Sequence, residues 1–366
     1  MRERLKRDLV ALMRVPGLSG HEDRVRRAIR DRLPPGLGPR ADRMGNLWVS
    51  FAGDPAAPSV MVFAHMDQLG FVVRRIDEDG GLRVERLGGV PERALAAQPV
   101  LAMVGEGRDV PGIIANKAHH ATPPEEKFTV VRVADLRIDT GHVSRTDAEA
   151  AGLGIGTPIV YAPNVIELAG DRIAGTAVDD RAGCAVLIEL ARALTARDGG
   201  PTVHLVFSVQ EEFNLRGAVV AAQALKPDIA IQLDLMLATD TPDMAGRGDM
   251  RLGAGPGISH YSFHGRGTLN GVIPHPALVQ LLKNTALDED IPLQHSAQVG
   301  VLTDLSYVQL VGGGVASVDL GFPMRYSHSS LEMCDLADLE ALSRLLLCAL
   351  SRIGPGFPLD RDGDGG

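Results

Sequence analysis

The sequence lacks the features that would assign it to a membrane or to an oxidising compartment. No apolar run approaches the roughly 20 residues that a membrane-spanning helix needs, and the segment MRERLKRDLVALM carries charges where a signal peptide has an apolar core. Only three cysteines occur, Cys184, Cys334 and Cys348, and they are too scattered for a disulfide framework. These absences favour a cytoplasmic protein with buried thiols.

Positive charge is also scarce relative to negative charge. The 37 Lys and Arg residues against 46 Asp and Glu give a formal net charge of −9, which argues against nucleic acid as the main partner. No dinucleotide-binding fingerprint is present, because GAGPG at 253–257 lacks the G-x-G-x-x-G spacing. With 45% hydrophobic residues, the chain can form one large globular domain or two smaller ones.

The middle of the chain differs from the parts on either side. Between 70 and 163, short apolar runs such as GFVVRRID, LRVERLGG and FTVVRVADLRID are separated by Gly, Asp and Pro, a pattern typical of all-β structure. Elsewhere, near-continuous apolar strands alternate with helical patterns such as RAGCAVLIELARALTA, which indicates a sheet with helices on both faces. We predict an α/β domain formed by 1–69 and 164–366, interrupted by a small β-barrel-like domain at 70–163, with 357–366 as a disordered tail.

The first part of the α/β domain contains one predicted helix start. Ser19 in VPGLSGHED is expected to cap a helix that begins near Glu22.

Metal-capable side chains stand at the ends of several predicted strands. In open α/β sheets, ligands bind in the crevice beyond the carboxyl ends of the strands. We therefore expect these side chains to converge, although they are spread over more than half of the chain. They are His65 and Asp67, Asp179 and Asp180, Glu211 and Glu212, Asp234, and His328.

So many carboxylates in one place would repel each other strongly without compensating positive charge. No cluster of Lys or Arg stands beside them in the sequence, whereas bound divalent cations would remove the repulsion. Histidine and carboxylate ligands without a thiolate suit zinc, cobalt or manganese. Five candidate ligands exceed the three that one catalytic zinc usually takes, so two metals are favoured, and a carboxylate such as Asp179 could bridge them.

Each residue also has a simpler interpretation. His65 alone could be an ordinary hydrogen-bonded histidine, Asp179 or Asp180 could cap the following helix, and Glu211 and Glu212 could be a solvated strand end. These separate explanations do not account for the same coincidence at five strand ends. His119 and His120, in the inserted domain, are expected to lie in a surface loop and not to bind metal.

Five short motifs in a fixed order resemble the tetrahedral aminopeptidase family of dinuclear metallopeptidases, which includes glutamyl and deblocking aminopeptidases and some proteins labelled endoglucanases. The resemblance covers nearly the whole chain and implies a zinc-exopeptidase-like fold of peptidase clan MH with a mixed sheet. The motifs are AHMDQLGFVV, GTAVDDRAG, SVQEEFNLRGA, IQLDLMLATDTP and RYSHS.

The resemblance implies a role for each matching residue. His65 and Asp234 would bind one metal ion, and Glu212 and His328 would bind the other. Asp179 would bridge the two ions. In addition, Asp67 would orient His65, and Glu211 would be the general base. The inserted β domain would serve for dimerisation, and dimers would assemble into a dodecamer.

Three short segments depart from the family pattern. Gln68 and Leu69 replace the usual Glu-Ile, Phe213 and Asn214 replace Val-Gly, and the stretch 302–305 reads LTDL where relatives read Gly-Thr-Asp-Ala. None of these departures removes a proposed ligand or the base. They bear on substrate specificity.

The predicted function is that of a metal-dependent aminopeptidase that removes N-terminal residues from short peptides with a free N-terminus. Water activated by two metals would attack the peptide bond, with Glu211 as the general base. Two alternatives remain open at this point. One is a metal-dependent deacylase acting on acylated amino acids, and the other is a non-catalytic, metal-stabilised scaffold that self-assembles.

Overall fold

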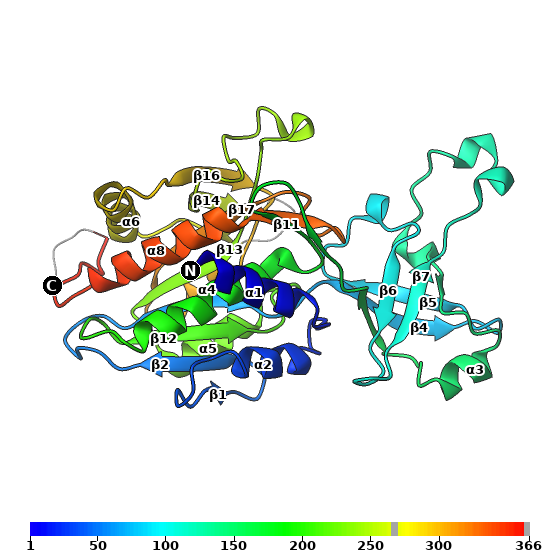
Figure 1. Ribbon diagram of the computed structural model, residues 1–366, viewed down its shortest axis with the longest axis horizontal. Coiled ribbons are helices and arrows are strands. Elements are labelled where there is room, and N and C mark those ends of the chain that lie inside the picture. Colours follow the sequence, from blue (N-terminus) through cyan, green and yellow to red (C-terminus); the bar gives the residue numbers. More distant parts are fainter. Residues whose placement is uncertain (265–269, 362–366) are drawn as a thin grey trace.

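The computed structural model describes residues 1–264 and 270–361 of the chain. They form a nine-stranded sheet flanked by helices, a three-stranded sheet and a closed β-barrel. Figure 1 shows the barrel standing at one end of the molecule, beside the helix-covered sheet. The predicted fold class, an α/β domain interrupted by a small β-barrel, is confirmed.

The large sheet is mixed, and its central strands β12, β3, β13 and β17 run parallel to one another. Their carboxyl ends therefore lie along one edge, where the crevice of an open α/β sheet forms. In spatial order the strands are β1 (Arg40–Ala41), β2 (Leu47–Phe51), β12 (Val203–Ser208), β3 (Val60–His65), β13 (Ile229–Leu237), β17 (Ala316–Met324), β14 (Gly257–Phe263) and β15 (Gly271–Val272), with β16 (Gln294–Val299) paired to β14.

Both faces of this sheet are buried by helices. Val60 and Val62 of β3 belong to the core that includes α1, α4 and α8, whereas Met61 and Phe63 pack with α5 and α7 on the opposite face. His65 lies on the same face of the sheet as Met61 and Phe63, because alternate residues of a strand share a face. None of the described helices has the length and hydropathy needed to cross a bilayer. The helices are α1 (Arg2–Met13), α2 (Asp23–Arg30), α4 (Val178–Leu194), α5 (Gly217–Leu225), α6 (Pro276–Asp288), α7 (Leu305–Val308) and α8 (Leu336–Ser351).

The barrel has its own apolar core, which includes Phe71, Val84, Ile114 and Ile159. Its strands are β4 (Gly70–Ile76), β5 (Leu82–Leu87), β8 (Ile138–Asp139), β7 (Val110–Ile114), β6 (Pro99–Ala102) and β9 (Pro158–Tyr161), in that spatial order. The remaining elements are α3 (Arg145–Ala150), β10 (Val165–Glu167), β11 (Arg172–Gly175), β18 (Glu332–Asp335), and the 3₁₀ turns η1 (Glu92–Ala94), η2 (His119–Ala121), η3 (Pro124–Glu126), η4 (Val133–Asp135) and η5 (Pro242–Met244).

Two local predictions are wrong. The run FTVVRVADLRID is mostly not a strand, since it contains the turn η4 and only its last two residues pair in β8. Phe128 in this run is 94% exposed, so no buried face selects an extended pairing there.

Ser19 does not cap α2, which begins at Asp23 without a side-chain cap. The Ser19 hydroxyl donates a hydrogen bond to the carboxylate of Asp67 instead.

The predicted tail at 357–366 is described up to Arg361, and 362–366 lie outside the described residues. Phe357 packs against the main core.

The sheet leaves no room for a side chain at Gly321, which pairs with Asp234 across β13 and β17. A Cβ atom there would overlap the backbone oxygen of Asp234, whereas one at Gly313 would meet nothing within 4 Å. We expect Gly321→Ala to lower the free energy of unfolding by about 1–3 kcal/mol and Gly313→Ala to change it by less than about 0.5 kcal/mol. Urea midpoints measure both variants, and equal midpoints would contradict this account of the packing.

Candidate metal centre

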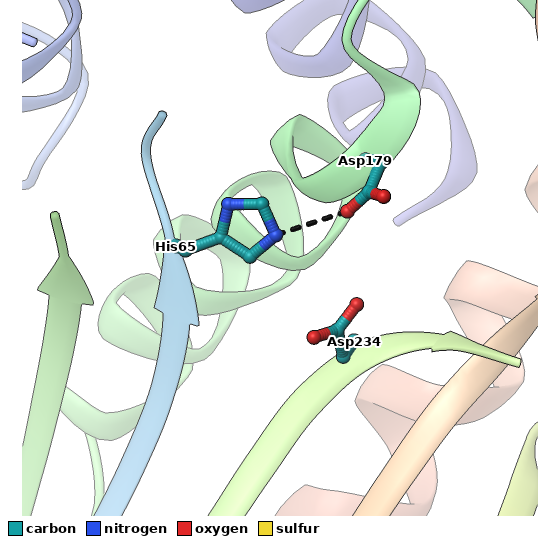
Figure 2. A group of neighbouring side chains, drawn as sticks. All are labelled: His65, Asp179 and Asp234. Atoms are coloured by element: carbon teal, nitrogen blue, oxygen red, sulfur yellow. Dashed lines mark hydrogen bonds and ion pairs between the residues drawn. The ribbon is translucent and has the colours of Figure 1, made fainter. Parts of the chain in front are cut away.

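Three side chains meet where the carboxyl ends of β3 and β13 face the start of α4 (Figure 2). His65 is the last residue of β3, Asp234 lies in β13, and Asp179 stands in the first turn of α4 with non-helical dihedral angles. His65 Nε2 and Asp179 Oδ1 are 2.9 Å apart. One ligand atom from each residue lies within 4.8 Å of the others, so the three could hold a metal ion.

A second group shares Asp179 with the first. His328 Nε2 lies 3.6 Å from Asp179 Oδ2 and 3.8 Å from Glu212 Oε1, and ligand atoms of these three residues also lie within 4.8 Å of one another. The two oxygens of Asp179 thus face different groups, Oδ1 toward His65 and Oδ2 toward His328. Imidazole and carboxylate donors without a thiolate fit zinc, cobalt or manganese. The structure brings together all five residues that the sequence proposed as ligands.

Burial makes these charged groups costly without a cation. It raises the pKa of Asp234 well above its usual range and that of Glu212 to about 7, with nearby carboxylates adding to both. Burial alone would lower the pKa of the two histidines, but neighbouring carboxylates outweigh it. The pKa of His328 rises to about 9, and that of His65 rises well above its usual value, mainly through its hydrogen bond to Asp179. A divalent cation would replace these protons and stabilise the carboxylates.

Glu211 lies beside both groups but belongs to neither. Its Oε2 is 4.0 Å from His65 Nε2, and burial raises its pKa well above the usual range. Glu211 and Glu212 both line a cavity of about 480 Å³, together with Asp179, Asp234 and His328. Adjacent glutamates at this strand end are therefore placed differently, one within a ligand group and the other beside it.

Asp67 is connected to both His65 and the glutamate pair. Its backbone carbonyl lies 3.1 Å from His65 Nδ1, closer than its carboxylate at 3.6 Å. A carbonyl only accepts, so this contact keeps the proton on Nδ1 and directs Nε2 toward Asp179. The carboxylate accepts the backbone N–H groups of Glu211 and Glu212, each at 3.0 Å. Asp67 thus holds the turn that carries both glutamates, which the sequence did not indicate.

Further hydrogen bonds fix the candidate ligands, and the sequence analysis missed them. Glu332 accepts the backbone N–H groups of Asp179 at 3.0 Å and His328 at 2.8 Å. His328 Nδ1 lies 3.0 Å from the carbonyl oxygen of Gly89, next to the barrel. Gln232 donates to Asp234 Oδ2 at 3.1 Å. Only Glu332 had a signal in the sequence, as an acid four residues after His328.

Asp180 has the simpler role that its position suggested. Its carboxylate accepts the N–H group of Gly183 at 2.9 Å, as a helix cap does, and that of His65 at 3.2 Å. The next residue, Arg181, is a cation that the sequence analysis overlooked. It is fully buried, and burial lowers its pKa to about 10. One guanidinium does not balance this many carboxylates.

Of the six residues that depart from the family pattern, two line the cavity and four do not. Asn214 and Leu302 line the cavity, and Asn214 adopts a left-handed conformation with φ 64°, which asparagine tolerates better than most residues. The other four contact different parts of the fold. The side-chain oxygen of Gln68 lies 3.5 Å from the Arg181 guanidinium, and Leu69 packs in the barrel core. Phe213 stacks against Arg216, and Leu305 of α7 is buried against α5.

The two histidines of the barrel loop, His119 and His120, are exposed in η2. They belong to neither ligand group of the described chain.

Comparisons with known proteins identify the family of this chain. A family model described as M42 glutamyl aminopeptidase matches residues 45–345. SgcX, a candidate aminopeptidase of Escherichia coli (strain K12), is 37% identical over 361 residues, covering 97% of this chain and 95% of that protein. The aminopeptidase APDkam598 from the archaeon Desulfurococcus kamchatkensis has a TM-score of 0.91 at 32% identity, covering 100% of this chain and 99% of that chain.

The TET1 peptidase of Pyrococcus horikoshii, which can assemble into a tetrahedron or a large octahedral shell, has a TM-score of 0.84 at 28% identity, with 96% of this chain and 99% of that chain covered. The family model spans most of the described residues, and the identity to SgcX extends over nearly the whole chain. The chain therefore belongs to the M42 glutamyl aminopeptidase family.

Proposed function

We propose that this aminopeptidase removes N-terminal residues from short peptides at a site that holds two divalent cations. His65 and Asp234 would bind one cation, Glu212 and His328 the other, and Asp179 both. The observation that carries the proposal is the position of Asp179, whose two oxygens face the two groups separately. Zinc and cobalt are the favoured ions, and manganese suits the same donors.

The side chains around the cavity suit hydrolysis of a peptide bond. Bound cations would supply a water molecule of lowered pKa and polarise the scissile carbonyl. Glu211 Oε2 would accept the proton of the attacking water and return it to the leaving amine. Asp67 would keep Glu211 in place through the backbone N–H group that it accepts, and would orient His65 through its carbonyl.

The acidic end of the cavity favours N-terminal residues. Asp179, Glu211, Glu212 and Asp234 all line it, and one of the two cations held there would bind a free α-amino group beside the reacting bond. An internal peptide bond offers no such group, and an acylated N-terminus removes it. Removal of single N-terminal residues therefore fits better than internal cleavage or deacylation.

The proposed assembly is a homo-oligomer in which the barrel joins dimers that form a dodecamer. The barrel exposes apolar side chains, including Phe128 at 94%, Val130 at 45% and Val131 at 47%, and such side chains favour a protein partner. The TET1 peptidase of Pyrococcus horikoshii has been solved as a dodecamer. Three free cysteines are in keeping with a cytoplasmic location.

The role of Glu211 predicts a loss of turnover without loss of metal. Glu211→Gln should lower kcat for aminoacyl p-nitroanilides by about 10²–10⁴-fold, measured after adding zinc or cobalt, with chelator abolishing the wild-type activity. Metal content should stay at the wild-type value, and Glu149→Gln, an exposed control in α3, should behave as wild type. Normal turnover in Glu211→Gln would refute the base assignment.

The hydrogen bonds of Asp67 predict an effect on metal affinity. Asp67→Asn keeps only one acceptor oxygen for the two N–H groups of Glu211 and Glu212, so the Glu212 side chain should be less well positioned. We expect metal affinity to fall about 10–100-fold in chelator competition. Asp77→Asn, in the barrel, serves as the control and should leave affinity unchanged. An unchanged affinity in Asp67→Asn would show that its carboxylate does not support the ligands.

The raised pKa values predict that metal binding releases protons. Without metal, Glu212 titrates at about 7 and His328 at about 9, so both carry protons below pH 7 and must lose them to bind a cation. Affinity should therefore rise with pH up to about 9. Calorimetry at pH 6 in buffers of different ionisation heat measures the protons released, and heats independent of the buffer would contradict the assignment.

A further inference from the structure

A small side cavity of about 30 Å³ lies next to the main one. Both cavities are lined by Asp234 and by the neighbouring side chains Leu235, Leu237, Val301 and Thr303. The N-terminal residue of a peptide substrate, with its amino group near Asp234, could therefore direct its side chain into this space. The far wall comes from β14, β16 and β17.

Two polar residues that line the side cavity each have a side-chain oxygen without a hydrogen-bond partner among the described residues. Asp319 Oδ1 accepts the hydroxyl of Thr303 at 2.8 Å, but Asp319 Oδ2 and Ser262 Oγ make no hydrogen bond to any described residue. Both side chains are 5% exposed. Leaving buried polar atoms unpaired is unfavourable, so these atoms indicate that a hydrogen-bond donor enters the cavity.

The strand register sets the distance of Asp319 from the metal centre. Gln232 pairs with Asp319 and Asp234 pairs with Gly321 across β13 and β17. Asp319 and Gly321 share a face of the sheet. Two residues of strand separate Asp319 from the level of Asp234, roughly 7 Å, a span that a side chain of four methylene groups can cover.

We propose that Asp319 is a specificity-determining residue that receives the side-chain ammonium group of an N-terminal lysine, with Ser262 as a second hydrogen-bond partner. The inference rests on the proposed aminopeptidase function. The cavity has room for a group about the size of a water molecule, so an ammonium fits better than the larger guanidinium of arginine. Burial raises the pKa of Asp319 to about 7, and a cationic partner would favour its ionised form.

The test compares peptides that begin with lysine or with norleucine, which has the same unbranched stem without the ammonium group. The wild-type enzyme should show kcat/KM about 10- to 100-fold higher for lysine, and a smaller preference for arginine. Asp319→Asn should bring the ratio of lysine to norleucine close to 1. Asp243→Asn, which removes an exposed acid in η5, should keep the wild-type ratio.

Binding of the free amino acids gives a readout that does not depend on turnover. Calorimetry should find L-lysine bound more tightly than L-norleucine by the wild type and bound equally by Asp319→Asn. If Asp319→Asn does not fold, Ser262→Ala should still lower the ratio measurably.

Peptide turnover without a lysine preference, together with equal binding, would overturn this inference, and the side cavity would then hold only ordered water. The proposed function would stand in that case. Absence of turnover on every peptide would instead contradict the proposed function, and the binding measurement alone would then decide the role of Asp319.

Discussion

The structure depends on the placement of Asp179 between two groups of acids and histidines, one buried and one half-buried. Its oxygens face His65 on one side and His328 on the other. Four carboxylates line one cavity, and burial raises the pKa of Asp234, Glu211 and Glu212, which marks the free-energy cost of keeping them charged. Divalent cations would offset this cost, so the residues that repel one another could together form a site for hydrolysis.

The surrounding scaffold holds these side chains through backbone groups. Asp67 accepts the N–H groups of both glutamates, and Glu332 accepts those of Asp179 and His328. The barrel takes part as well, since the carbonyl of Gly89 contacts His328. Each candidate ligand on a loop or helix end is thus tied to another element of the fold, and this arrangement limits movement of the ligands when protons are exchanged for cations.

Much of this arrangement was predictable, because alternating strand and helix patterns place His65, Asp179, Glu212 and Asp234 at one edge of a parallel sheet. The hydrogen bonds of Asp67 and Glu332 were not, since they join residues separated by more than 140 positions or by an irregular loop. Asp319 was missed for a similar reason. Its place near Asp234 depends on the register of β13 against β17, which a sequence does not specify. The exposed run around Phe128 shows that strand propensity without a buried face does not predict a strand reliably.

The central claim is that Asp179 bridges two cations. Anomalous X-ray diffraction from zinc-loaded crystals, recorded at the zinc absorption edge, tests it most directly. The account predicts two anomalous peaks about 3.5–4 Å apart, one beside His65 and Asp234 and one beside Glu212 and His328, with Asp179 in contact with both. A single peak, or two peaks of which Asp179 touches only one, would contradict it.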